Sequence, residues 1–308
     1  MKKTVKFLSM VLALAMMFSL AACGGEPAEE PADKPAEAPA EEPAEAPAEE
    51  PAEEADGAVE TVVPGTLTVA TSPDFAPYEF YAIAEDGNPQ LAGFDIALAG
   101  YVADYLGLKL EIIPMDFDGV LNELAAGSVD IGLAGLSPDP ERANAMDFSD
   151  IYYAGGQSFV TVEGKEDQFK TLEDTNKAEY SIAAQNGSIQ MDLANKYSAD
   201  ADIIALTKVT DIVSELLGGK IDGAYIETAV AEKYAENFPE LKIVLDVPYE
   251  SKGSAVGVMK GNESLLAGVN EAVAACLADG SMESFVAQAN KDAEGNIKEG
   301  LLTEGGEA

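Results

Sequence analysis

The hydrophobic and polar positions from Val59 onward alternate between short β-rich runs and amphipathic stretches. Short apolar, β-branched runs are typical of buried strands, and apolar residues spaced three and four apart are typical of helices packed on a sheet. Strands are predicted at 67–71, 109–114, 130–133, 180–185, 202–206, 223–226, 241–245 and 254–259. Helices are predicted at 94–106, 118–126, 138–145, 188–197, 209–217, 228–238, 263–278 and 281–289. This order of elements predicts an α/β fold with largely parallel sheets.

Two features punctuate this series. The predicted helix at 138–145 begins with Ser137 as N-cap and Pro138 at the first helical position. Turn-rich stretches at 153–158 and 248–254 interrupt the alternation twice. We therefore expect two lobes joined by two crossing segments. The first lobe would comprise 59–158 plus 248–308, and the second would comprise 159–247.

The first residues have the pattern of an export signal. Three lysines precede an apolar run at 7–20, which has the length of a signal core and is short for a membrane span. The run ends in Leu-Ala-Ala-Cys at 20–23, which resembles a bacterial lipobox. We interpret 1–22 as a lipoprotein signal peptide and Cys23 as the lipid-modified first residue of the mature chain. An ordinary signal peptide with an incidental cysteine is the alternative.

Residues 24–58 form a low-complexity segment of Pro, Glu and Ala. Proline recurs at every fourth position from 27 to 51, which removes a hydrogen bond from each turn of any helix. The segment carries 13 acidic residues against one Lys and has few large apolar side chains. It cannot bury a core, so we expect an extended tether that starts at the lipidated cysteine and spans 23–58. An interaction tail is the alternative.

Composition excludes several classes of function. The formal net charge of −38 argues against a nucleic-acid surface, which needs clustered Lys and Arg. The chain has no His, so Ser-His-Asp, Cys-His and His-zinc sites are excluded. Two cysteines without a CxxC motif leave no thiolate zinc or iron–sulfur site. We therefore expect binding without chemistry, no cofactor or metal, and an affinity nearly independent of pH between about 5.5 and 7.5.

Four short motifs carry a family resemblance. They are GFDI at 93–96, MDFDG at 115–119, LSPDPER at 136–142 and DFSDIYY at 147–153, and a return segment follows at 254–285. Over about residues 66–290 the sequence resembles the extracellular solute-binding proteins of family 3, which serve amino-acid ABC importers. The resemblance implies a two-lobe, periplasmic-binding-protein-like (type II) fold with a ligand cleft between the lobes.

The resemblance also implies how the ligand carboxylate is held. Arg142 is the sole arginine of the chain and occupies the family's carboxylate-clamping position. A planar guanidinium suits a bidentate carboxylate contact. Ser188 and the amide of Ile189, where a helix follows a strand, would complete the cradle at the positive end of the helix dipole. The alternatives are a surface Arg142 paired with Asp139 or Glu141, and a plain N-cap at Ser188.

The remaining ligand contacts are implied in the same way. The ammonium would meet Gly135, Ser137 and Glu227, the last standing where the family usually has Asp. Phe75 and Phe117 fall where the family sandwiches the ligand side chain, although each could be a core residue. Ser72 stands where relatives for glutamine or basic amino acids often carry Asp. A neutral or polar amino acid is therefore our expectation, with nearby Asp74 as a possible replacement charge.

The sequence thus predicts a lipid-anchored, extracytoplasmic, monomeric binding protein. Its partners would be a free amino acid and an ABC permease with separate ATPase subunits. The rival interpretation is a cyclohexadienyl (arogenate/prephenate) dehydratase on the same fold, with Glu227 beside Ser137 and Arg142. A receptor sensor domain is a third interpretation, disfavoured because no transmembrane segment follows the last predicted helix.

Overall fold

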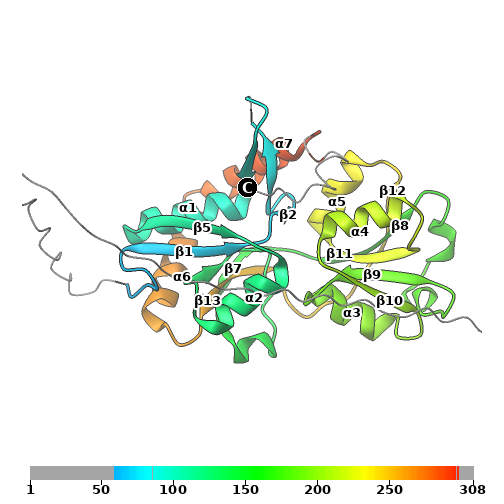
Figure 1. The fold of residues 1–308 in the computed structure, drawn as a ribbon, viewed down its shortest axis with the longest axis horizontal. Helices are drawn as coiled ribbons and strands as arrows, with labels where there is room; N and C mark the ends of the chain where they lie inside the picture. Colours follow the sequence, from blue (N-terminus) through cyan, green and yellow to red (C-terminus); the bar gives the residue numbers. More distant parts are fainter. Residues whose placement is uncertain (1–58, 85, 296, 298–308) are drawn as a thin grey trace, which may run out of the picture. The chain divides into compact units, whose positions relative to one another are not determined.

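The computed structural model describes residues 59–84, 86–295 and 297. The predicted signal peptide, Cys23 and the tether lie outside these residues. No helix of the described residues is long and apolar enough to cross a membrane. The described chain builds two five-stranded sheets flanked by helices, and one small three-stranded sheet (Figure 1).

The first lobe is organised around a sheet with the strand order β5-β1-β6-β13-β7. Helices pack against it, and the small sheet β2-β3-β4 adjoins it. Its strands are β1 (Thr66–Thr71), β2 (Asp74–Phe75), β3 (Glu79–Ile83), β4 (Pro89–Ala92), β5 (Lys109–Pro114), β6 (Ile131–Gly132), β7 (Met146–Tyr153) and β13 (Ser254–Met259). Its helices are α1 (Phe94–Leu106), α2 (Phe117–Ala126), the 3₁₀ helix η1 (Arg142–Asn144), α6 (Glu263–Ala278) and α7 (Ser281–Ala293).

The second lobe repeats this arrangement with the strand order β10-β9-β11-β8-β12. Its core includes Phe159, Phe169 and Tyr225. Its strands are β8 (Gln157–Val162), β9 (Ser181–Gln185), β10 (Asp202–Leu206), β11 (Gly223–Glu227) and β12 (Leu241–Asp246). Its helices are the 3₁₀ helices η2 (Glu166–Gln168) and η3 (Leu172–Thr175), then α3 (Ile189–Tyr197), α4 (Val209–Leu217) and α5 (Thr228–Asn237).

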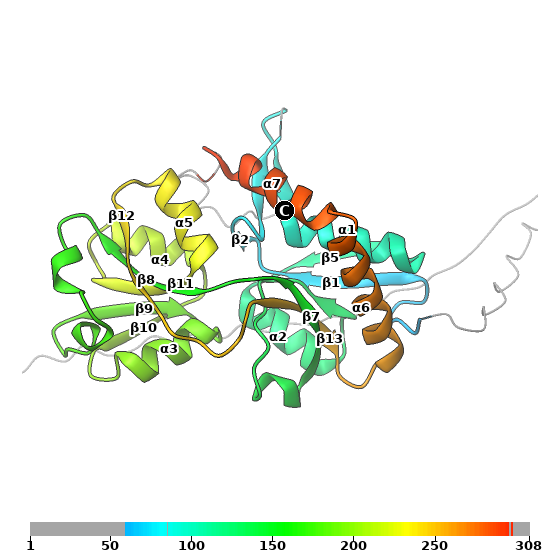
Figure 2. The same ribbon diagram turned by 180° about the vertical axis from the view of Figure 1, so that it is seen from behind.

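The chain passes between the two sheets twice. It leaves the first lobe between β7 and β8, at 154–156, and returns between β12 and β13, at 247–253. Figure 2 shows the two connections running side by side between the lobes. They join the lobes where a relative rotation needs changes in only a few backbone angles.

The sheets differ from the prediction in strand direction. β1 pairs in parallel with β5 and β6, and β9 pairs in parallel with β10 and β11. The strands that follow each crossing, β8 and β13, instead run antiparallel to both of their neighbours. The expectation of largely parallel sheets was therefore wrong for half of the strand pairings in the two five-stranded sheets. A crossing strand enters the new sheet from the opposite end, which reverses its direction.

The predicted helix at 138–145 is absent from the structure. Only η1, Arg142–Asn144, is helical there, and the Ser137 side chain caps no helix. Pro140 explains the difference, because a proline disfavours helical backbone at the preceding residue, here Asp139. Asp139 instead accepts a hydrogen bond from the Glu141 N–H at 2.7 Å. The segment 137–139 therefore runs without regular structure before η1.

Candidate functional site

The loops at the carboxyl ends of the parallel strands face one another across the two lobes. Ligands of open α/β sheets bind at such strand ends. The lobes touch there: Asn186 donates to Asp118 at 3.4 Å, and Val209 N–H donates to the Asp74 carboxylate at 2.5 Å. The structure therefore brings residues that are far apart in the sequence to one inter-lobe surface.

Arg142 lies across this surface. Its Nη1 donates to the carbonyl of Ser137 at 3.3 Å in the first lobe, and its Nη2 donates to the carbonyl of Gly187 at 3.0 Å in the second. Its guanidinium carbon lies 5.6 Å from the centre of the Phe117 ring. Among the described residues Arg142 forms no ion pair, and burial lowers the pKa of its guanidinium. A guanidinium has five N–H donors, so donors remain for an anion.

Gly135 and Phe75 form a second part of the site. Gly135 has φ of 57°, and a Cβ placed on it would lie 2.7 Å from Cε1 of Phe75. Only glycine fits this left-handed conformation against the ring. The Phe75 ring also contacts Tyr78, and the two ring centres are 5.4 Å apart. Phe75 and Phe117 are both buried, but they belong to separate apolar clusters.

Ser188 and Ile189 lie at the start of α3. The Ser188 hydroxyl accepts from Met191 N–H at 3.2 Å and donates to the Gln185 carbonyl at 2.7 Å. The N-cap alternative for this serine is therefore present in the structure. Ile189 is buried, with its side chain in the core cluster of the second lobe. The first-turn N–H groups of α3 have no partner within the helix, which leaves this terminus suited to an anion.

Glu227 is buried where β11 ends and α5 begins. One carboxylate oxygen caps α5 by accepting from Val230 N–H at 3.0 Å, and the other accepts from Gly156 N–H at 3.4 Å in the first crossing segment. The Tyr78 hydroxyl lies within hydrogen-bonding reach. Neither Gly135 nor Ser137 hydrogen bonds to Glu227 in the described chain. Gly135 contacts Phe75, Phe75 contacts Tyr78, and the Tyr78 hydroxyl reaches Glu227, so two aromatic side chains connect Gly135 to Glu227.

Two of the buried carboxyl groups with raised pKa values, Glu227 and Asp74, lie where the lobes meet. Burial raises the pKa of Glu227 to about 7 and that of Asp74 to about 6, although backbone N–H donors oppose the shift in both cases. Both groups therefore titrate in the range where the absence of His predicted an invariant affinity. That prediction considered unperturbed pKa values only, and burial of carboxyl groups overturns its premise.

Sequence reasoning missed several residues at this surface. Tyr78 and Gln185 line it from opposite lobes, and Gln185 donates to the Asp74 carboxylate at 3.3 Å. Tyr249, in the second crossing segment, lies within reach of the Ser137 hydroxyl, and burial raises the pKa of its own hydroxyl. Tyr78 and Asp74 lie in the motif SPDFAPYEF, so that motif was the available signal. Tyr249 had no comparable signal.

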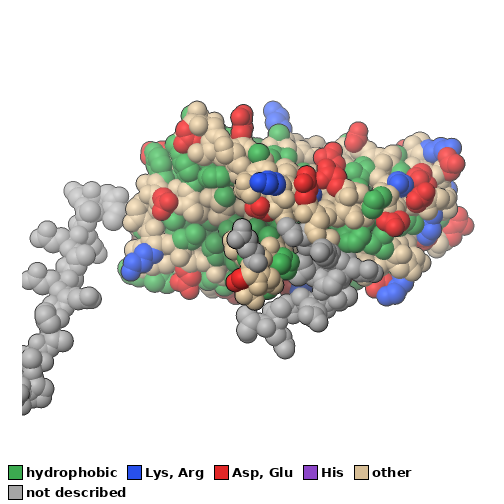
Figure 3. Space-filling model, turned by 90° about the horizontal axis from the view of Figure 1, so that it is seen from above, with side chains coloured by type: hydrophobic (Ala, Val, Ile, Leu, Met, Phe, Trp, Pro, Cys, Tyr) green, Lys and Arg blue, Asp and Glu red, His purple; other side chains and the backbone are tan. Residues whose placement is uncertain are grey.

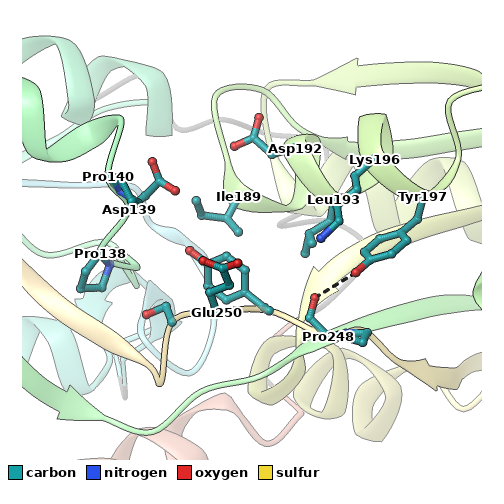
Figure 4. Close-up of a pocket in the computed structure, with 12 residues that line it drawn as sticks. Pro138, Asp139, Pro140, Ile189, Asp192, Leu193, Lys196, Tyr197, Pro248 and Glu250 are labelled. Carbon is teal, nitrogen blue, oxygen red and sulfur yellow. Dashed lines mark hydrogen bonds between the residues drawn. The ribbon is translucent and has the colours of Figure 1, made fainter.

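An open cavity of about 400 Å³ adjoins these residues. Figure 4 shows the loop at 138–140 on one side, α3 on the other and the second crossing segment between them. Tyr197 bridges part of this gap through a hydrogen bond to the Pro248 carbonyl at 3.5 Å. Of the eight predicted ligand residues, only Ile189 lines this cavity. The cavity therefore lies beside most of the predicted ligand residues rather than among them.

The outer surface carries mixed charge. On the face seen in Figure 3, basic side chains lie singly or in small groups among acidic ones. Among the described residues, no group of three or more Cys, Asp or Glu side chains is arranged to hold a metal ion.

Comparison with known proteins identifies the family. Residues 67–290 match the bacterial extracellular solute-binding proteins, family 3, and the chain belongs to this family. The arginine-binding extracellular protein ArtP of Bacillus subtilis is 31% identical over 64% of this chain and 75% of its own. The crystal structure of AbpA, an amino acid ABC transporter substrate-binding protein from Streptococcus pneumoniae bound to L-arginine, is 30% identical and covers 74% of this chain and 96% of that chain, with a TM-score of 0.71.

One relative is an enzyme. The cyclohexadienyl dehydratase of Pseudomonas aeruginosa is 28% identical over 58% of this chain and 65% of its own. The family match and the likeness to AbpA show that this chain has the two-lobe, type II periplasmic-binding-protein fold. The chain belongs to a family of extracytoplasmic solute-binding proteins of ABC transporters.

Proposed function

We propose that this protein captures a free amino acid between its two lobes and delivers it to an ABC permease with separate ATPase subunits. The observation that carries the proposal is Arg142, a half-buried guanidinium that forms no ion pair among the described residues and donates to carbonyl groups of both lobes. An α-carboxylate bound there would contact both lobes at once, so the ligand would bind the closed arrangement better and shift the population toward it. Calorimetric titration with single amino acids tests this, and we expect one site per chain.

The ammonium of the same ligand would lie near Glu227, Ser137 and the carbonyl of Gly135. Glu227 supplies the compensating negative charge, and a buried ammonium needs such a partner. Phe75 and Phe117 would provide apolar walls for the ligand side chain. Ser188 and the amide of Ile189 would complete the carboxylate contact with Arg142.

For the ligand side chain we propose a neutral or polar group. Asp74 is the acidic residue that would pair with a cationic ligand side chain. Its carboxylate already accepts hydrogen bonds from the Ser72 hydroxyl, the Gln185 amide and Val209 N–H. Its backbone carbonyl accepts from the Tyr234 hydroxyl at 3.1 Å. These contacts engage the carboxylate within the protein. Arginine is the alternative ligand, because ArtP and AbpA bind it.

Asp74→Asn separates these two ligand classes. If Asp74 only joins the lobes, the substitution lowers affinity for every bound amino acid by a similar factor, about tenfold or more, because it loses charge-assisted hydrogen bonds between the lobes. Asp118→Asn is the matched control, since its inter-lobe contact is exposed, and we expect it to change affinity by less than about threefold. A loss confined to arginine and lysine in Asp74→Asn, and absent from Asp118→Asn, would assign Asp74 to a cationic ligand.

We further propose that Cys23 carries a lipid that anchors a monomeric protein outside the cytoplasmic membrane. Two or more acyl chains hold a protein stably on a membrane, whereas a folded domain without a lipid is not held there. Cys23→Ser should therefore move the protein from the membrane fraction, or leave it unprocessed, without changing ligand affinity. Fractionation and metabolic lipid labelling check this. A processed Cys23→Ser protein that is still labelled would refute the lipid attachment.

The dehydratase interpretation is tested separately. Both oxygens of Glu227 accept backbone hydrogen bonds, and its pKa of about 7 is the property that a catalytic acid would also need. Incubation with prephenate or arogenate should release no phenylpyruvate or phenylalanine above the uncatalysed rate. Enzyme-dependent product formation that disappears in Glu227→Gln would establish the dehydratase instead.

A further inference from the structure

Two carboxyl groups lie fully buried behind the Gly135 loop. Glu79 is on β3 and Asp95 is in the first turn of α1, and both side chains have no exposed surface. One oxygen of Asp95 accepts from Gly135 N–H at 3.0 Å and from the Tyr152 hydroxyl at 2.9 Å. The other Asp95 oxygen and both Glu79 oxygens have no hydrogen-bond partner among the described residues. Buried acceptors without donors cost about 1–3 kcal/mol each, and more when charged.

The missing donor is a proton. The Glu79 and Asp95 carboxyl groups lie within hydrogen-bonding reach of each other. Of the described residues, the charged groups that act on Glu79 are Asp95 and Asp74, both acidic, and no ion pair joins either carboxyl to a Lys or Arg. Two adjacent buried carboxylates without a cation cannot both be ionised. Burial and these like charges raise the pKa of Glu79 well above its ordinary value.

The surroundings decide which group holds the proton. Asp95 has the Gly135 N–H, the Tyr152 hydroxyl and the positive end of the α1 dipole, all of which favour a carboxylate. Glu79 has no donor of its own. The protonated group is therefore Glu79, and its hydroxyl donates to Asp95.

We propose that Glu79 and Asp95 share one buried proton and that this pair positions Gly135 in the ligand-binding loop. The positioning role rests on the proposed function, because Gly135 is taken there as a ligand contact. Asp95 ties three parts of the first lobe together: α1, β7 through Tyr152, and the loop that follows β6. The N–H contact to Asp95 fixes the plane of the Ala134–Gly135 peptide, and the Phe75 ring occupies the place of a Cβ on Gly135, so both contacts restrict the backbone at Gly135.

Asp130 shows how the same chain treats a buried carboxylate that has donors. It is fully buried, and it accepts from Val62 N–H at 2.7 Å, Thr68 N–H at 2.8 Å and the Thr68 hydroxyl at 2.6 Å. Both of its oxygens thus have hydrogen-bond donors. Asp130→Asn is therefore the matched control for a substitution of a buried acid outside the Glu79–Asp95 pair.

Infrared spectroscopy of the protein at about pH 8.5 tests the shared proton, because Glu227 and Asp74, whose pKa values are about 7 and 6, are then ionised. The other titratable groups that face the pair are Tyr78 and Tyr152, whose spectra do not overlap a carboxylic-acid carbonyl stretch. We expect that stretch in the wild-type protein and in Asp130→Asn, and its loss in Glu79→Gln. Its absence from the wild-type protein, or its persistence in Glu79→Gln, would overturn the proposal.

Ligand affinity tests the positioning role. Glu79→Gln keeps an N–H donor toward Asp95, so it should fold and bind within about threefold of wild type. Asp95→Asn places an NH₂ group or a weaker acceptor against Gly135 N–H and should lower affinity by about tenfold or more. An unfolded Glu79→Gln, or an unchanged affinity in Asp95→Asn, would contradict the role. If no amino acid binds while the infrared band is present, the proposed function fails and the shared proton stands.

Discussion

Arg142→Ala is expected to lower affinity for the amino acid by about 30- to 5,000-fold. The reason is that truncation leaves a carboxylate buried between the lobes without its partner, which costs about 2–5 kcal/mol. Arg142→Lys should recover part of this loss, because an ammonium restores the charge but not the two-pronged contact. Calorimetric titration of both variants with the identified ligand provides the measurement.

Lys196→Ala is the matched control for charge. Lys196 lines the neighbouring cavity on α3, and its ammonium lies over the Tyr197 ring rather than between the lobes. Removing it takes away one positive charge near the cleft without touching the predicted carboxylate site, so affinity should stay within about threefold. If Arg142→Ala, still folded by its melting temperature, binds as well as Lys196→Ala, Arg142 does not hold the ligand.

Glu227→Gln is expected to lower affinity by about 10- to 150-fold near pH 8, because a neutral amide replaces the charge that pairs with the ligand ammonium. In the wild-type protein the pKa of Glu227 is about 7, so it is protonated in the free protein below that pH. Binding of an ammonium requires the ionised form. Affinity should therefore fall as pH decreases from about 8 to 5.5, by up to about tenfold per unit, with proton release on binding.

The same group affects stability with the opposite sign. A carboxyl group whose pKa is raised by folding stabilises the free protein most below its unfolded pKa, near 4.5, and that contribution is lost as pH rises through about 7. Ligand binding and folding of the free protein therefore respond to pH in opposite directions.

Glu227→Gln should flatten the dependence of ligand affinity on pH, whereas Glu227→Asp should keep its slope. A wild-type affinity that is constant across this range would remove Glu227 from the ammonium site.

The regular elements were predictable because their signals are local. The helices at 94–106 and 209–217 and the strand at 254–259 have the bounds that the apolar spacing indicated. The β2-β3-β4 sheet was missed, since its strands are short and Pro77 and Pro89 disrupt any alternation. Strand direction in the two main sheets depends on how the chain crosses between lobes, which no local pattern encodes.

The site was predictable only in part. Arg142 stood out as a unique arginine within a motif, and the structure places it between the lobes. The contacts of Asp74 were not predictable, because they depend on Gln185 and Val209, more than a hundred residues away. Glu79 and Asp95 lie within the motifs SPDFAPYEF and GFDI, but no pattern shows that the two side chains meet: each looks like a polar position on a strand or helix. Both Glu79 oxygens and one Asp95 oxygen are buried without a hydrogen-bond donor, and only the folded structure shows this.

The central claim is that an amino acid binds between the lobes, and a thermal-shift series with each of the twenty L-amino acids tests it most directly. A ligand at 100 times its dissociation constant adds about 2.7 kcal/mol to the free energy of unfolding, and each kcal/mol raises the melting temperature by about 2–4 °C in a protein of this size. We expect at least one amino acid to raise it by about 5–10 °C. If none shifts it by more than about 1 °C at roughly millimolar concentration, the amino-acid-binding account is wrong.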